Sequence, residues 1–135
     1  MTKTGHGEVA KAALLTEEEQ AQSVVIADPG RDDMAIIFVS DEFETQTGYP
    51  AEEVLGRNCR FLQGADTEPA AAQAIRDAIA DEREISIDIL NYRKDGTPFW
   101  NRLRIRPLYD DNGKLLYFAG AQNPIDAGEA KPIGA

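Results

Sequence analysis

The sequence predicts an α+β domain, in which short helices and a set of long strands share one core. The chain has 135 residues, which suits one compact domain, and 42% of them are hydrophobic. Its last third alternates strand-like runs with tight turns, and the segment before it has the apolar spacing of a helix. The strands are expected at residues 84–92, 98–108 and 114–122, with turns at 94–97 and 110–113, and the helix at 67–80.

The two ends of the chain are expected to lie outside this domain. Residues 1–21 predict a polar tail followed by one or two short cap helices, because Thr16 and Glu19 have the spacing of a capping box. Residues 124–135 are rich in Ala, Gly and Pro, a composition typical of an unstructured tail. The folded domain is therefore expected to span residues 22–123.

Shorter elements are expected between the cap and the long helix. A β-branched run at residues 24–26 ends at a turn signal, and a second apolar run covers residues 35–39. Short helical pieces follow at residues 41–58, interrupted by glycine and proline. In residues 67–80 the apolar side chains repeat with helical spacing, so they form one buried stripe with Arg76 beside it.

Composition argues against several classes of partner and site. The chain has 14 basic and 24 acidic residues, and its net charge of −10 argues against a nucleic acid or an anionic membrane as the main partner. Cys59 is the only cysteine, which rules out an internal disulfide and a multi-thiolate metal site. The apolar stretch 35–39 is too short to span a bilayer, and the N-terminus lacks a secretion signal. These features predict a cytoplasmic protein.

Each of the three long strands carries one primary amide on a face that is otherwise apolar. Strand side chains alternate between faces, so Asn91, Asn101 and Gln122 lie among isoleucine, leucine and phenylalanine side chains. Three buried amides on neighbouring strands favour one shared polar ligand, such as the pyrimidine edge of a flavin. Gly120 in the same series predicts the close approach of a bulky group. The alternative is that each amide bonds the backbone locally at a strand end.

The segment around Cys59 is the most specific feature of the sequence. Residues 56–64 read Gly-Arg-Asn-Cys-Arg-Phe-Leu-Gln-Gly, and three further motifs follow in order: Asn91-Tyr92-Arg93-Lys94-Asp95-Gly96, Phe99-Trp100-Asn101 and Phe118-Ala119-Gly120-Ala121-Gln122. Over residues 22–123 the chain resembles the light-oxygen-voltage (LOV) domains, a photosensory branch of the PAS superfamily. The resemblance implies a PAS fold, in which a five-stranded antiparallel sheet and short helices enclose one flavin mononucleotide (FMN).

The resemblance also implies a role for each matched residue. Cys59 would add reversibly to ring atom C(4a) of the photoexcited flavin, and the three amides would bond the polar edge of the ring. Arg60 and Arg76 would hold the phosphate; without the resemblance they would read as ordinary surface charges. The other implied contacts, to the ring faces and the ribityl chain, are Val25, Ile36, Asn58, Leu62, Gln63, Leu103, Phe118 and Gly120.

The same resemblance implies how a signal leaves the flavin. When the adduct forms, ring atom N(5) gains a proton, and Gln122 is expected to respond by rotating its amide. Outward-facing apolar residues on the long strands, such as Leu90 and Leu108, need cover, which predicts a homodimer through the outer sheet face and the N-terminal helix. If the chain is complete, no effector domain follows, and the output is an interaction with a protein partner that the sequence does not identify.

Three other functions use the same features. An enzyme with Cys59 as nucleophile needs a nearby base, and because the only histidine is His6, in the N-terminal tail, an enzyme is not expected. A flavin-binding redox sensor would use the same pocket and the same cysteine. A ligand-free interaction module would be colourless when purified with flavin available.

Overall fold

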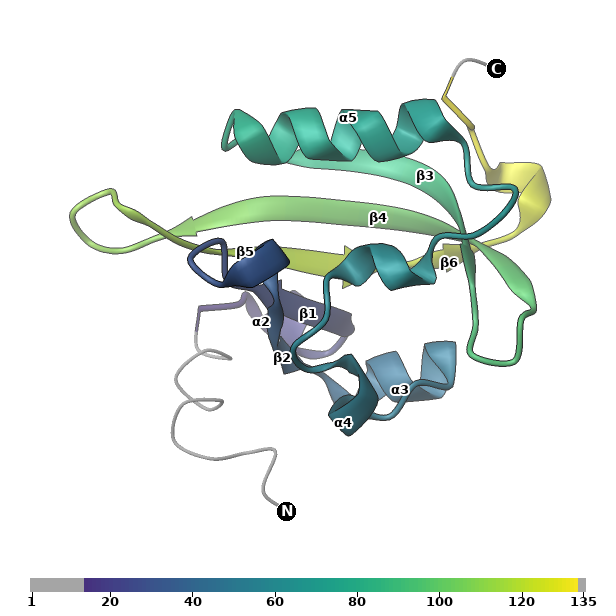
Figure 1. Cartoon of the computed structure of the whole chain (residues 1–135), viewed down its shortest axis with the longest axis horizontal. Coiled ribbons are helices and arrows are strands. Elements are labelled where there is room, and N and C mark those ends of the chain that lie inside the picture. The colour runs from purple at the N-terminus through teal and green to yellow at the C-terminus, as the bar shows by residue number, and fades with distance from the viewer. Residues whose placement is uncertain (1–13, 134–135) are drawn as a thin grey trace.

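The computed structural model describes residues 14–133, and its centre is an antiparallel sheet with helices packed on it (Figure 1). The strands lie in the order β2-β1-β5-β4-β3, and a short sixth strand, β6, pairs with β4. Their bounds are β1 (Ser23–Ala27), β2 (Ile36–Val39), β3 (Ile85–Tyr92), β4 (Pro98–Tyr109), β5 (Leu115–Gln122) and β6 (Pro124–Ile125).

Two hairpins build the long half of the sheet, and both turn where the sequence predicts. Gly96 between β3 and β4 has φ of 89°, and Gly113 between β4 and β5 has φ of 81°. These left-handed conformations suit glycine, which has no Cβ to clash with the backbone. In the β3–β4 register Ile89 lies opposite Asn101, and in the β4–β5 register Ile105 lies opposite Gly120. The predicted inner face is therefore continuous across three strands.

The helices are short except for the one predicted before β3. That helix, α5, lies along β3, whereas α3 packs against β1 and α4 against β2 (Figure 1). Its first residue is Pro69, which suits a position where no intrahelical N–H bond is needed. The helices are α2 (Glu17–Gln20), α3 (Asp41–Thr47), α4 (Ala51–Val54) and α5 (Pro69–Ala80), and the 3₁₀ turns are η1 (Asp32–Met34), η2 (Cys59–Leu62) and η3 (Ala127–Glu129).

The N-terminal segment covers part of the outer face of the sheet. Leu15 is buried in a cluster with Val24, Ile26 and Leu108, which is separate from the cluster that packs against α5. The predicted capping box is confirmed: the Glu19 N–H donates to Thr16 Oγ1 at 3.1 Å, and the Thr16 N–H donates to Glu19 Oε1 at 2.9 Å. The part of the predicted cap that falls on residues 8–13 lies outside the described residues.

The prediction that residues 124–135 are unstructured is wrong for their first half. Pro124 and Ile125 form β6 beside β4, and residues 127–129 form η3. The segment is held by backbone groups, since the Arg102 N–H donates to the Asn123 carbonyl at 2.7 Å and the Lys131 N–H donates to Asp88 Oδ2 at 2.8 Å. These partners lie on β3 and β4, so the local composition of the tail does not reveal them.

Candidate functional site

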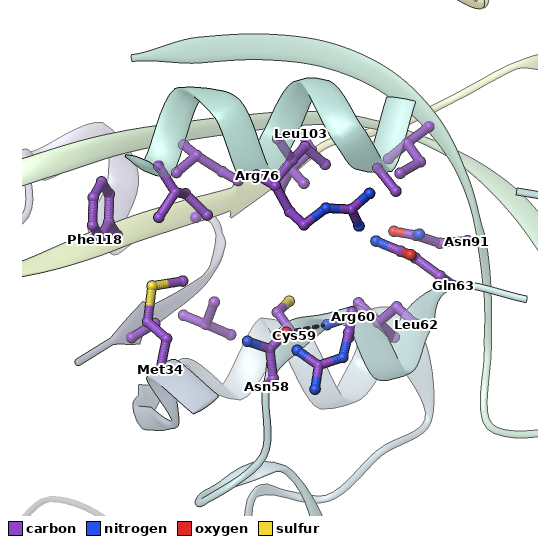
Figure 2. A pocket seen from close by; sticks show the side chains of 18 of the residues that line it. Met34, Asn58, Cys59, Arg60, Leu62, Gln63, Arg76, Asn91, Leu103 and Phe118 are labelled. Carbon is purple, nitrogen blue, oxygen red and sulfur yellow. Dashed lines mark hydrogen bonds between the residues drawn. The ribbon is translucent and has the colours of Figure 1, made fainter. Parts of the chain in front are cut away.

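A cavity lies between the inner face of the sheet and the segments η1, η2 and α5 (Figure 2). Including the part that opens to solvent, its volume is about 870 Å³. Most of its walls are apolar, a composition typical of a small-molecule site with a few placed polar groups. Twelve of the fourteen residues predicted to contact the cofactor line it: Val25, Asn58, Cys59, Arg60, Leu62, Gln63, Arg76, Asn91, Leu103, Phe118, Gly120 and Gln122.

The other two predicted residues, Ile36 and Asn101, do not line the cavity. Ile36 is 2% exposed and packs in one core cluster with Val25 and Leu62, which both line the cavity. Asn101 is fully buried and lies behind the other two amides. Both residues therefore support the wall from behind.

The three predicted amides converge. Asn101 Nδ2 donates to Asn91 Oδ1 at 2.9 Å and to Gln122 Oε1 at 2.6 Å. The amides of Asn91 and Gln122 also bond the nearby backbone. Asn91 Nδ2 donates to the Leu90 carbonyl at 3.2 Å, and Gln122 Nε2 donates to the Gly120 carbonyl at 3.2 Å. The three amides therefore bond one another, and two of them also bond the backbone locally. Asn91 and Gln122 bring amide groups to the cavity wall on a fixed framework.

Cys59 is held at the start of a 3₁₀ turn. The preceding residue, Asn58, caps this turn, because its Oδ1 accepts from the Arg60 N–H at 3.0 Å. Figure 2 shows the Cys59 sulfur directed into the cavity. Burial raises the pKa of the Cys59 thiol to about 12, since a thiolate loses its hydration there. The group is therefore a neutral thiol at physiological pH.

Two guanidinium groups stand at the mouth of the cavity. Figure 2 shows Arg76 reaching in from α5, with Arg60 on the opposite side in η2. Arg76 Nη2 donates to Gln73 Oε1 at 2.7 Å, and Arg60 forms an ion pair with Asp33. Both head groups are exposed, so each can exchange its present partner for an anion at small cost.

Seven cavity residues were not predicted as contacts, although the sequence contained a signal for four of them. Ile89 and Ile105 share the inner strand face with the predicted residues, and Ile75 and Ile79 belong to the predicted stripe of α5. The sequence contains no usable signal for the remaining three. Met34 lies in an irregular turn with φ of 49°, where no periodicity applies, and the small side chains of the other two, both alanines, do not mark a ligand contact. These three are Ala27, Met34 and Ala72.

Residues 14–133 contain neither a group of metal ligands nor a membrane-spanning helix. Within that range no three acidic, cysteine or histidine side chains are grouped so that they could hold a metal ion. None of the helices in the same range has the length and apolar character needed to cross a membrane.

Comparison with known proteins agrees with this architecture. A family model for the PAS domain matches residues 22–123. The chain is 46% identical over 134 residues to a blue-light-activated histidine kinase of Rhizobium johnstonii, covering 99% of this chain and 38% of that protein. It is 52% identical over 101 residues to phototropin-2 of Oryza sativa subsp. japonica, covering 75% of this chain and 11% of that protein.

Solved structures show the same relationship in three dimensions. The dark structure of the blue-light photoreceptor Aureochrome1 LOV superposes with a TM-score of 0.78 at 40% identity, covering 89% of this chain and 84% of that one. A structure reported as "Flavin Analogue Sheds Light on Light-Oxygen-Voltage Domain Mechanism" gives a TM-score of 0.80 at 42% identity, covering 84% of each chain. The chain therefore belongs to the PAS domain family, in its LOV branch.

Proposed function

We propose that this chain senses blue light by binding FMN in the cavity and by forming a reversible bond between the flavin and Cys59. The observation that carries the proposal is the position of a protonated thiol in the wall of a cavity that also presents two amides and two guanidinium groups. Similarity to a blue-light-activated histidine kinase and to the blue-light photoreceptor Aureochrome1 LOV supports it.

The lining of the cavity fits each part of FMN. The apolar side chains of Val25, Leu103 and Phe118 suit the faces of an aromatic ring. Gly120 has no side chain, so the ring can approach the sheet closely at that position. The amides of Asn91 and Gln122 can donate to and accept from the alternating N–H and C=O groups of a pyrimidine edge. Asn101 would position both of them, because it bonds each one.

The phosphate would be held at the mouth of the cavity. Arg60 and Arg76 supply planar paired donors that match phosphate oxygens, on a protein whose net charge is −10. Arg60 would leave its exposed ion pair with Asp33 to do so. Asn58 and Gln63, which also line the cavity, would contact the ribityl chain.

The chemistry requires a thiol that keeps its proton. A bound flavin supplies the absorption of blue light and an electrophilic ring atom that a thiol can attack. Cys59 supplies the sulfur and also a proton, so it must be protonated in the dark. Burial meets this requirement, since it raises the pKa of Cys59 well above physiological pH.

The amide cluster offers a route from the cavity to the chain end. Gln122 Oε1 accepts from Asn101 Nδ2, and Asn101 Oδ1 accepts from the Asn123 N–H at 2.9 Å. If the Gln122 amide rotated, its Nε2 would face Asn101 Nδ2, and two donors cannot bond each other. Asn101 would then have to move, which would disturb the backbone at the start of the C-terminal segment.

The output would leave from the outer face of the sheet. The N-terminal residue Leu15 packs against Leu108 on this face, and residues 127–131 cover another part of it. We propose homodimerisation through this face and the N-terminal segment. Because the chain spans only 38% of the Rhizobium histidine kinase, the kinase activity in that protein's name is not proposed for this chain.

An absorption spectrum before and after blue illumination tests the photochemistry. The FMN-loaded protein is expected to lose its blue absorption band in the light and to regain it in the dark. Cys59→Ala is expected to bind FMN equally and to keep its band under the same light. Reversible bleaching in Cys59→Ala would refute the role of the thiol, and flavin binding without bleaching in the wild type would favour a redox sensor. Scattering measurements in the dark and in the light test the dimer; a strict monomer in both states would contradict it.

A further inference from the structure

A linker joins the turn that carries Cys59 to helix α5. It covers residues 63–68, between η2 and α5. Its first residue continues η2, because the Gln63 N–H donates to the Arg60 carbonyl at 2.9 Å. Gln63 and Asn91 both line the cavity, one from the linker and the other from β3 (Figure 2). Contacts that hold the linker on β3 therefore also hold η2 relative to the amides.

Thr67 fastens the linker through both functions of its hydroxyl, which can accept and donate at the same time. Its Oγ1 accepts from the Gly64 N–H at 2.9 Å and donates to the Leu90 carbonyl at 2.6 Å. The Thr67 N–H closes the same turn by donating to the Gly64 carbonyl at 3.1 Å. Leu90 belongs to β3, which ends the strand order of the sheet, so a side chain can reach the strand from its free side.

The Leu90 carbonyl is also part of the amide cluster. Asn91 Nδ2 donates to this same oxygen at 3.2 Å, and Asn91 Oδ1 accepts from Asn101 Nδ2 at 2.9 Å. A carbonyl oxygen has two lone pairs, so it can accept from both Thr67 and Asn91. A continuous chain of hydrogen bonds thus runs from the linker to the amides at the cavity wall.

Tyr92 makes a second, separate contact with the linker. The Asp66 N–H donates to the Tyr92 hydroxyl oxygen at 3.0 Å. The linker backbone also lies directly against the ring, because a Cβ at Gly64 would be 2.4 Å from two Tyr92 ring atoms. The ring limits how closely the linker approaches β3, and the directional Thr67 bond sets its position along the strand.

We propose that Thr67 and Tyr92 are positioning residues that hold Cys59 and Gln63 in a fixed place relative to Asn91. Neither is among the residues that line the cavity, so both act through the linker. The inference rests on the proposed function, because this placement matters for a ligand bound between the thiol and the amides. A displacement of reacting groups by about 1 Å can slow a reaction by about a hundredfold.

Replacing the hydroxyl of Thr67 tests the proposal in the full chain loaded with FMN. Thr67→Val keeps the branched shape, and it is expected to slow bleaching under the same blue light by about threefold. It is also expected to shift the Asn91 side-chain amide signal in the NMR spectrum, because the Leu90 carbonyl loses one donor. Thr67→Ser retains the hydroxyl and is expected to restore both. Thr97→Val is the matched control, since its exposed hydroxyl donates to Asp95 Oδ1 at 2.7 Å within a turn, and it is expected to bleach at the wild-type rate.

Several results would overturn the proposal. These are a wild-type bleaching rate with an unchanged Asn91 signal in Thr67→Val, equal slowing in Thr67→Val and Thr97→Val, or no rescue by Thr67→Ser. If Thr67→Val does not fold, Tyr92→Phe removes the acceptor of the Asp66 N–H and is expected to slow bleaching, and a wild-type rate there would overturn the proposal. If the wild type itself does not bleach, the proposed function fails, and the Asn91 signal alone then decides whether Thr67 holds the linker.

Discussion

Raising the pH probes the environment of the Cys59 thiol directly. Burial raises its pKa from 9.0 to about 12, so between these values the folded protein keeps a proton that the unfolded chain has released. The folded state binds more protons in this window, and its free energy of unfolding must therefore fall as the pH rises. The stabilisation is complete below pH 9.0 and is lost at about 1.4 kcal/mol per pH unit above it.

Urea denaturation at about pH 7.5, 9.0 and 10.5 would measure this loss, because these values lie below, at and above the ordinary pKa of a thiol. Tyrosine and lysine also titrate in this range, so Cys59→Ala serves as the reference that shares every other titration. Between pH 9.0 and 10.5, the wild type is expected to lose about 1.5 kcal/mol more than Cys59→Ala. Alkylation by iodoacetamide should also remain slow at pH 9.0. Parallel stability curves for the two proteins would show that the thiol titrates normally and would refute the reasoning.

Three further predictions concern the site and its support. Gly64→Ala is expected to destabilise the protein by about 1–3 kcal/mol in urea denaturation, because a Cβ there would lie 2.4 Å from two atoms of the Tyr92 ring; an unchanged midpoint would contradict it. Glu19→Gln is expected to cost about 1–3 kcal/mol at neutral pH, since Glu19 Oε1 and Oε2 accept from Arg106 at 2.6 and 2.7 Å. The Arg106 bonds lower the pKa of Glu19, so this difference should vanish only as the pH falls through the lowered value, and a difference that persisted below it would count against the ion pair. Arg76→Ala is expected to weaken FMN by about tenfold but to leave riboflavin, which lacks the phosphate, unchanged; equal losses for both ligands would exclude a phosphate contact.

Local patterns in the sequence were sufficient for the inner face of the sheet. Strand periodicity identified the face that carries Asn91, Asn101 and Gln122, because a strand side chain has only two directions to choose from. The turn residues set both hairpins, since a left-handed residue is required at each turn. The pattern could not show that Asn101 lies behind the other two amides, because depth within a face depends on what packs above it.

Pairings between distant segments were decided only by the tertiary structure. The C-terminal segment is ordered because its backbone meets Arg102 and Asp88, and nothing in its own Ala/Gly/Pro-rich sequence encodes those partners. Met34 reaches the cavity from an irregular turn that has no periodicity to read.

The sequence by itself determined the strand faces, the helix stripe and the motif around Cys59, since each depends on neighbours a few positions away. The fold alone decided that Asn101 bonds both Asn91 and Gln122, because contacts between side chains of different strands depend on how the whole chain packs around them.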